Sequence, residues 1–413
     1  MKILPVLVLA LLAFRAAAET PEDLRRLREE VRRFDPVAAR LAVADLARNP
    51  VYDAATHRAA VEALAAKRDW ALAHLAPTCT AGRAEAVALV QGFRRALLAN
   101  PLLDADRILC VRRRLANPVW PRADRPGGSD FPYVKRGLSR SLGLLGLNAH
   151  NHMDLKRTGF TNEIAVLSNL RATPTLSTLY RPPDTAIVRD LDLDFDASRI
   201  LFTTDTGTNN LLGVYEVQVG NGAVARVSPE DGAHDVQWWD ACYLPNPDQV
   251  VLLGTGAYQF LPCEDGNFPM CVLYRIDRRT GETIQLTFEQ DSDYTPTVLN
   301  DGRVVYTRWE YSDLQHYFSR ELMTMNPDGV GQLALYGSGS YFPTFFCGAR
   351  AIPGEPHRLV LMAGGHHGRA EHGRLLLLDP TRARRYPARY DPPDREWGPP
   401  LHTFRLPVQT LPA

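Results

Sequence analysis

A strand pattern that repeats about every fifty residues constrains the fold of this chain more than any other feature. The clearest copy spans 291–329, where the apolar run Val304-Val305-Tyr306 lies between two Asp-Gly pairs, Asp301-Gly302 and Asp328-Gly329. Asp-Gly supplies the positive φ angles that tight hairpin turns need. The copy therefore has the pattern strand, turn, strand, long loop, strand and turn. With the strand that follows the last turn, this pattern predicts one four-stranded antiparallel blade.

Weaker copies of this unit occur along the chain. The second strand of each copy begins at residues 108, 200, 250, 304 and 359, with intervals of 92, 50, 54 and 55. The long first interval predicts an insertion at about 112–162. Intervals near fifty are typical of propeller blades, whereas a β-sandwich has no reason to repeat at a fixed period. We predict an all-β propeller with five recognisable blades; a sandwich is the alternative, and closure by a sixth blade from the tail or by a partner chain stays open.

The repeat region is flanked by segments of different composition. Residues 19–100 are Ala-rich, and apolar residues recur three or four apart in their first part, at Leu24, Leu27, Val31 and Phe34. This spacing predicts a small region of three or four short α-helices before the propeller. We assign the propeller to residues 101–390 and a Pro-rich tail to residues 391–413.

Residues 1–18 have the pattern of a cleaved secretory signal peptide. Lys2 precedes the apolar run 3–14, which is too short to span a bilayer, and Ala16 and Ala18 fit a small-x-small cleavage site. The alternative is a buried N-terminal helix. We expect a periplasmic or secreted protein without a transmembrane segment. Its 47 basic and 47 acidic side chains leave no net charge, so nucleic acid is not an expected partner.

Several polar runs in the repeat region share their residues and their order with one known family. They are Asp192-Leu-Asp-Phe-Asp196, Cys242-Tyr-Leu-Pro245, Thr307-Arg-Trp-Glu-Tyr-Ser-Asp313, His316-Tyr-Phe318, Met325-Asn-Pro-Asp-Gly329, Tyr336-Gly-Ser338, Pro353-Gly354 and Gly365-His-His-Gly368. From about residue 105 to 385 the chain resembles the middle domain of the hydrazine synthase alpha-subunit family. The pattern Asp-x-x-Pro followed by Asp-Gly-Arg-Val resembles the repeat of TolB-type propellers.

The resemblance implies the fold more than the reaction. In the founding enzyme of the family, a β-propeller lies beside multihaem cytochrome regions, and haem iron carries the nitrogen chemistry. This sequence has no Cys-x-x-Cys-His motif, so we expect no c-type haem and no hydrazine synthesis. A separately encoded cytochrome is one partner that the resemblance leaves open.

The six cysteines have no Cys-x-x-Cys spacing. Cys263 and Cys271 flank a short loop, and they either bridge its two ends or remain free thiols. No disulfide connectivity follows from the sequence.

Strand order predicts where the long loops gather. In an antiparallel four-stranded blade, the loop between strands two and three lies at the same end as the connection to the next blade. Seven of the eight histidines between residues 101 and 385 fall in these stretches: His150, His152, His234, His316, His366, His367 and His372. Such clustering favours a transition-metal site or an acid/base centre, whereas the structural alternative is histidines that hold Gly-rich loops through backbone hydrogen bonds.

Two classes of function remain open. The first is a binding or scaffold module for a small molecule or a protein, with binding candidates Arg308, Trp309, Glu310, Asp313, His316, Tyr317, His234 and Asp235. The alternative is a metal-dependent hydrolase or lyase, with metal-ligand candidates His316, His366, His367 and His372. No cofactor is certain, and a transition metal is the one that these histidines would suit.

Overall fold

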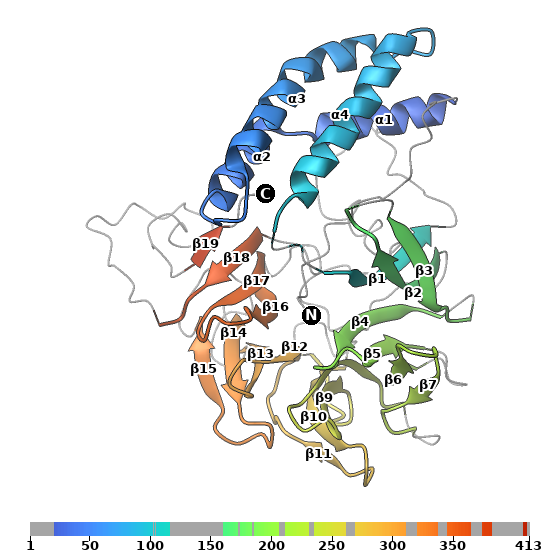
Figure 1. The fold of residues 1–413 in the computed structure, drawn as a ribbon. Helices are drawn as coiled ribbons and strands as arrows, with labels where there is room; N and C mark the ends of the chain where they lie inside the picture. The colour runs from blue at the N-terminus through green and yellow to red at the C-terminus, as the bar shows by residue number, and fades with distance from the viewer. Residues whose placement is uncertain are drawn as a thin grey trace, which may run out of the picture. The chain divides into compact units, whose positions relative to one another are not determined.

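The computed structural model describes residues 20–101, 103, 105–115, 160–171, 174–183, 186–205, 211–230, 235–261, 269–310, 320–337, 345–364, 374–381 and 408–410. These residues form two compact units, one that contains the N-terminal helices and one that contains most of the strands (Figure 1). None of the helices in these ranges has the length and apolar character that crossing a membrane requires. The predicted signal peptide lies outside the described residues.

Four helices confirm the predicted N-terminal helical region: α1 (Pro21–Arg33), α2 (Pro36–Leu46), α3 (Ala54–His74) and α4 (Thr80–Leu98). The first three begin after residues whose side chains accept a hydrogen bond from a backbone N–H of the first turn, namely Thr20, Asp35 and Asp53. Apolar side chains of all four helices form one buried core. This core includes the residues whose spacing predicted α1, among them Leu27, Val31 and Phe34.

The strands form a five-bladed β-propeller of antiparallel sheets, which confirms the predicted fold class (Figure 1). Blade 1 has three strands, β1 (Arg107–Leu115), β2 (Phe160–Ser168) and β3 (Thr175–Tyr180). Blades 2 and 3 contain β4 (Val188–Leu193), β5 (Arg199–Thr204), β6 (Gly213–Gln218) and β7 (Val224–Arg226), then β8 (Trp238–Tyr243), β9 (Gln249–Gly254), β10 (Val272–Asp277) and β11 (Thr283–Gln285). Blades 4 and 5 contain β12 (Asp293–Val298), β13 (Val304–Trp309), β14 (Arg320–Met325) and β15 (Leu333–Tyr336), then β16 (Phe345–Ala351), β17 (Leu359–Gly364), β18 (Arg374–Leu378) and β19 (Val408–Thr410).

The order of the strands defines two ends of the propeller. In blades 2 to 5, sheet order follows chain order, and the first strands β4, β8, β12 and β16 are in contact from one blade to the next. The loops between second and third strands therefore lie at the same end as the connections between blades. We call this end the loop face, and the opposite end, which carries the two remaining turns of each blade, the turn face.

The turns of blade 4 have the geometry that their Asp-Gly pairs predict. Gly302 and Gly329 both have φ of 88°. The Asp301 side chain accepts a hydrogen bond of 3.1 Å from the backbone N–H of Arg303. The Asp328 side chain accepts an equivalent hydrogen bond from the backbone N–H of Val330. In both turns the Asp side chain thus satisfies a backbone N–H of its own turn.

The first strands of blades 2 to 5 each contain a β-bulge, which the sequence pattern did not predict. The pairing register shifts directly after Arg189, Trp239, Tyr294 and Cys347. The next residue has a left-handed backbone in every case, with φ of 45–60° at Asp190, Asp240, Thr295 and Gly348. Only one of these four residues is glycine, so no single residue type marked the position in the sequence.

The Pro-rich tail supplies a strand to blade 5. β19 pairs with β18, so the tail completes an existing blade and does not form a sixth. A buried contact also joins blades 5 and 2, because Arg350 Nη1 of β16 lies 3.4 Å from Asp192 Oδ1 of β4. Asp192 Oδ2 accepts a hydrogen bond of 2.9 Å from the backbone N–H of Tyr243. Burial raises the pKa of the Asp192 carboxyl group.

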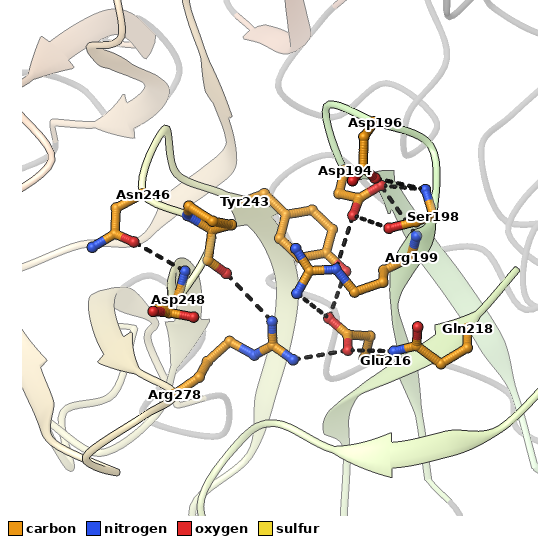
Figure 2. A network of polar contacts seen from close by, with 11 residues as sticks. Asp194, Asp196, Ser198, Arg199, Glu216, Gln218, Tyr243, Asn246, Asp248 and Arg278 are labelled. Atoms are coloured by element: carbon orange, nitrogen blue, oxygen red, sulfur yellow. Dashed lines mark hydrogen bonds and ion pairs between the residues drawn. The ribbon is translucent and has the colours of Figure 1, made fainter.

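A buried polar network joins blades 2 and 3 near the turn face (Figure 2). The Glu216 carboxylate accepts a hydrogen bond of 2.8 Å from the Tyr243 hydroxyl, and it also lies 2.8 Å from Arg278 Nη2. Arg199 Nε lies 2.9 Å from the Asp194 carboxylate, and Arg199 Nη1 is 3.8 Å from Glu216. In this Glu216 network, two arginines face two buried carboxylates, so the charges balance. Burial, followed by the hydrogen bond to Glu216, raises the pKa of Tyr243 and keeps its phenol protonated.

Candidate functional site

Four of the predicted binding residues lie in the described ranges, and all four are at the loop face. Arg308 and Trp309 end β13, Glu310 follows them, and Asp235 lies in the connection that precedes β8. The remaining predicted binding residues and every predicted metal ligand fall outside the described residues: Asp313, His316, Tyr317, His234, His366, His367 and His372.

Arg308 is the centre of a buried cluster between blades 3 and 4. Its Nη1 lies 3.1 Å from the Glu289 carboxylate, and its Nε lies 3.5 Å from the carboxylate of Asp293. Its Nη2 donates hydrogen bonds of 2.8 Å to the Tyr306 hydroxyl and to the side-chain oxygen of Gln332. The Arg308 side chain is only 7% exposed. It joins the two blades from within and does not project toward a ligand.

The Arg308 cluster contains more acid than base. Glu289 and Asp293 pair with the same arginine, and Glu310 adds a third carboxyl group nearby. Burial raises the pKa of Asp293 to about 7, although Arg308 and a 2.5 Å hydrogen bond from Thr287 act in the opposite direction. Burial and then repulsion from Glu289 also raise the pKa of Glu310. The charge of this cluster therefore depends on pH near neutrality.

Trp309 belongs to the core of the propeller. It is 1% exposed, and the Arg320 guanidinium lies 3.8 Å from the centroid of its ring. The same guanidinium lies 5.8 Å from the ring centroid of Tyr294 and 5.9 Å from that of Phe345. These cation–π contacts anchor the start of β14, so Trp309 has a packing role at this face.

Exposed aromatic side chains, which sequence analysis did not select, lie on the loop face of blades 3 and 4. Phe260 and Phe288 line a groove of about 360 Å³ whose other lining residues are Gln259, Glu289 and Gln290. Phe288 is 75% exposed and Phe260 is 52% exposed. We call these five residues the aromatic groove. Through Glu289 it is in direct contact with the Arg308 cluster.

A third exposed aromatic residue, Tyr258, lies in the same loop as Phe260 and has a strained backbone. Its φ is 53°, in the left-handed region that bulky residues avoid, and its N–H donates to the Thr255 carbonyl at 3.0 Å. Ala257 packs on the core cluster that contains Val236. The loop is thus fixed to the core while it presents exposed rings, a combination that is typical of binding surfaces.

The loop face of blades 3 and 4 is acidic. Its described stretches are 227–230, 235–237, 255–261, 269–271, 286–292 and 310. They contain no Lys or Arg and five acidic residues: Glu230, Asp235, Glu289, Asp291 and Glu310. The turn-face stretches of the same blades, 244–248, 278–282, 299–303 and 326–332, contain four acidic residues and three arginines. Asp291 is buried, and Glu230 lies 3.6 Å from Arg226 Nη1. Glu289 shares Arg308 with Asp293. Among the described residues, the partly or fully exposed acids of this set that form no ion pair are therefore Asp235 and Glu310. The excess of acidic over basic residues is still larger at this end of the two blades than at the turn face.

The sequence carried a weak signal for the aromatic groove. Phe260 and Phe288 both lie between strands, Phe260 directly after Gln259 and Phe288 directly before Glu289, where an apolar residue is not needed for a blade. Leu261 and Leu286 lie in the same two stretches, however, and both are buried. Sequence alone does not separate the exposed rings from these core residues.

The described ranges contain no group of three or more His, Cys, Asp and Glu side chains placed to hold a metal ion. Cys271 is a buried free thiol whose Sγ lies 3.2 Å from the Asp293 carbonyl oxygen. Cys263, for which the sequence left a disulfide to Cys271 open, lies outside the described residues. Burial raises the pKa of the Cys271 thiol well above its usual value, so this group is not a reactive thiolate.

A second cavity, of about 260 Å³, lies at the turn face between blades 4 and 5. Its basic side chains include Arg303 and Arg358. Arg303 Nη2 lies 2.8 Å from the Asp301 carboxylate, and Arg358 Nε lies 3.8 Å from that of Asp379. Because these arginines have acidic partners within the protein, this cavity is a weaker candidate for binding than the aromatic groove.

No protein-family model and no curated protein matches the chain. Solved structures with a similar fold include hydrazine synthase from Kuenenia stuttgartiensis, at 14% identity and a TM-score of 0.43, over 53% of this chain and 34% of that chain. TolB from Acinetobacter baumannii matches at 13% identity and a TM-score of 0.36, over 73% of this chain and 68% of that chain. A puromycin hydrolase matches at 10% identity and a TM-score of 0.36, over 55% and 32%. Identities this low show similarity of fold alone, and the chain spans about a third of the hydrazine synthase chain.

Proposed function

We propose that this protein is an extracytoplasmic binding module whose partner docks on the loop face of blades 3 and 4. The observation that carries the proposal is the aromatic groove, where two exposed phenylalanine rings lie beside amide and carboxylate side chains. Exposed aromatic residues that gather around a groove are characteristic of interaction sites, whereas isolated exposed residues are ordinary. Arg308, which was chosen from the sequence, contacts this surface through Glu289 at 3.1 Å.

The same proposal includes a relationship to the hydrazine synthase alpha-subunit family without its chemistry. Its support is the set of polar runs that the chain shares in order with the middle domain of that family. Haem-dependent activity is not proposed, because the sequence has no haem-attachment motif. The predicted ligands of the alternative, a metal-dependent hydrolase or lyase, lie outside the described residues, and no observation on the described ones favours that function.

Arrays of synthetic peptides and glycans, probed with labelled protein, test the proposal. We expect binding that the double variant Phe260→Ser with Phe288→Ser removes. Phe195→Ser is the matched control, since Phe195 is 68% exposed in the turn between β4 and β5, at the turn face. Binding that both variants lose equally, or that neither loses, would contradict the assignment to this groove.

A further inference from the structure

We infer that the aromatic groove binds an arginine or lysine side chain from a basic segment of a protein partner. This inference rests on the proposed function, because it names the class of partner for the same groove. Three independent features of the described residues carry it: the composition of the groove, the charge of its surroundings and the extent of the exposed aromatic surface.

The first feature is the chemistry of the groove itself. Phe260 and Phe288 contribute exposed aromatic rings, and Glu289 contributes a carboxylate to the same lining. Aromatic rings with a carboxylate suit a cationic head group on an apolar stem, because the rings attract the charge and also cover the methylene groups. The protein uses the same pairing in its own core, where Arg320 lies over Trp309 at 3.8 Å.

The second feature is charge complementarity. The described loop-face stretches of blades 3 and 4 contain five acidic residues and no Lys or Arg. Asp291 is buried and Glu230 lies 3.6 Å from Arg226, so Asp235, Glu289 and Glu310 carry the charge that a partner meets. Arg308 is next to the groove, but it is shared between Glu289 and Asp293 and is almost fully buried. Glu289 keeps 29% of its side-chain surface exposed. A positively charged partner is attracted to this surface, whereas an acidic peptide or a polyanion is repelled.

The third feature favours a protein segment over a free amine. Tyr258, two residues before Phe260 in the same loop, is a third exposed aromatic residue, at 55%. A single small cation would leave that ring uncovered. A peptide that places one basic side chain in the groove covers Tyr258 with the residues next to it, in the way that interface anchors are surrounded by neighbouring contacts.

Fluorescence anisotropy with four labelled peptides tests the inference: (Gly-Ser-Arg)₃, (Gly-Ser-Lys)₃, (Gly-Ser-Gln)₃ and (Gly-Ser-Glu)₃. We expect the Arg and Lys peptides to bind at low salt, with affinity that falls as NaCl is raised, and the Gln and Glu peptides to bind at least tenfold more weakly. Phe288→Leu retains apolar surface but removes the ring, and we expect it to weaken binding of the Arg peptide about tenfold. Glu289→Gln should weaken binding by a similar factor.

Matched controls come from the turn face. Phe195→Leu and Glu282→Gln change exposed residues of the same types, and we expect both to bind the Arg peptide as the wild type does. Since Glu289 also contacts Arg308, Glu310→Gln provides a second acidic variant, and thermal unfolding confirms that each variant is folded.

Each remaining outcome overturns a defined part of the inference. Equal binding of the Gln and Arg peptides, or no effect of Phe288→Leu, would rule out recognition of a cation by the ring. Agmatine alone binding as tightly as the Arg peptide would rule out the protein segment. If the arrays instead show binding to neutral peptides or glycans, and this binding requires Phe260 and Phe288, the proposed function stands and the inference of a cationic partner is wrong.

Discussion

Two buried clusters of arginine and carboxylate join blades of this propeller, and they differ in charge balance. The Glu216 network, near the turn face, places Arg199 and Arg278 against Glu216 and Asp194. The Arg308 cluster, near the loop face, places one arginine among three carboxyl groups. A balanced network stabilises the contact between two blades, whereas the second cluster leaves negative charge at its surface.

The surroundings of the two clusters follow the same division. Near the Glu216 network, the turn-face stretches 244–248 and 278–282 carry arginines as well as acids. Near the Arg308 cluster, the stretches carry acids alone and the exposed rings of Phe260 and Phe288. Excess charge and exposed aromatic surface thus coincide at one end of the molecule, which is the end we assign to binding.

The largest expected effect is that of Glu216→Ala. This substitution removes the acceptor shared by Tyr243 and Arg278 and leaves their buried polar groups without it. We expect a loss of about 3–5 kcal/mol in the free energy of unfolding, similar at pH 5.5 and pH 8 because the network is charge-balanced. Urea unfolding followed by tryptophan fluorescence measures it. The exposed Glu282→Ala is the control, at within about 0.5 kcal/mol of wild type.

A smaller and pH-dependent effect is expected for Arg308→Gln. At pH 8 the variant leaves Glu289 and Asp293 without their cation, so Asp293 must either remain ionised unpaired or take up a proton, which we expect to cost about 2–4 kcal/mol. At pH 5.5 the loss should be clearly smaller, since Asp293, with a pKa of about 7, is then mostly protonated. Equal losses at the two pH values would show that the Arg308 cluster is as balanced as the Glu216 network.

Asp293→Asn tests the origin of that pH dependence. Burial raises the pKa of Asp293 to about 7, whereas its value in the unfolded chain is near 4. Arg308 and the hydrogen bond from Thr287 lower this pKa, and repulsion from Glu289 raises it. The folded protein therefore binds more protons than the unfolded chain between about pH 4 and pH 7. The contribution of Asp293 to stability is full below about pH 4 and is lost as pH rises through 7.

The asparagine variant cannot ionise and should escape this loss. We expect it to match wild type at or below about pH 4 and to exceed it at pH 8 by an amount on the order of 4 kcal/mol. Urea midpoints of both proteins across this pH range provide the measurement. Parallel curves for the two proteins would contradict a raised pKa at Asp293.

The smallest expected effect on stability is that of Phe288→Ser. The ring is 75% exposed, so its removal should change the free energy of unfolding by about 0.5 kcal/mol or less, as for other exposed substitutions, which urea unfolding measures. The matched Phe195→Ser should behave alike in unfolding, although we expect the two to differ in binding. A large loss of stability for Phe288→Ser alone would assign that ring to packing and weaken the comparison between the two faces.

Sequence reasoning predicted the repeated architecture and the direction of the loops. The predicted strand starts at residues 200, 250, 304 and 359 differ by at most one residue from the starts of β5, β9, β13 and β17. The strand order placed Arg308, Glu310 and Asp235 at the loop face, where they lie. The bulges at Asp190, Asp240 and Thr295 were not predicted, because the left-handed conformation there is imposed by pairing across the blade and not by glycine.

By itself, the sequence determined the helical region, the period of the blades and the tight turns, since hydrophobic spacing and Asp-Gly turn chemistry are local properties. Only the tertiary structure decided that the tail completes blade 5, that Arg308 and Trp309 are buried, and that Phe260 and Phe288 share one groove. These outcomes depend on contacts between blades that are far apart in the chain. Burial and charge balance arise from such contacts, and no local pattern encodes them.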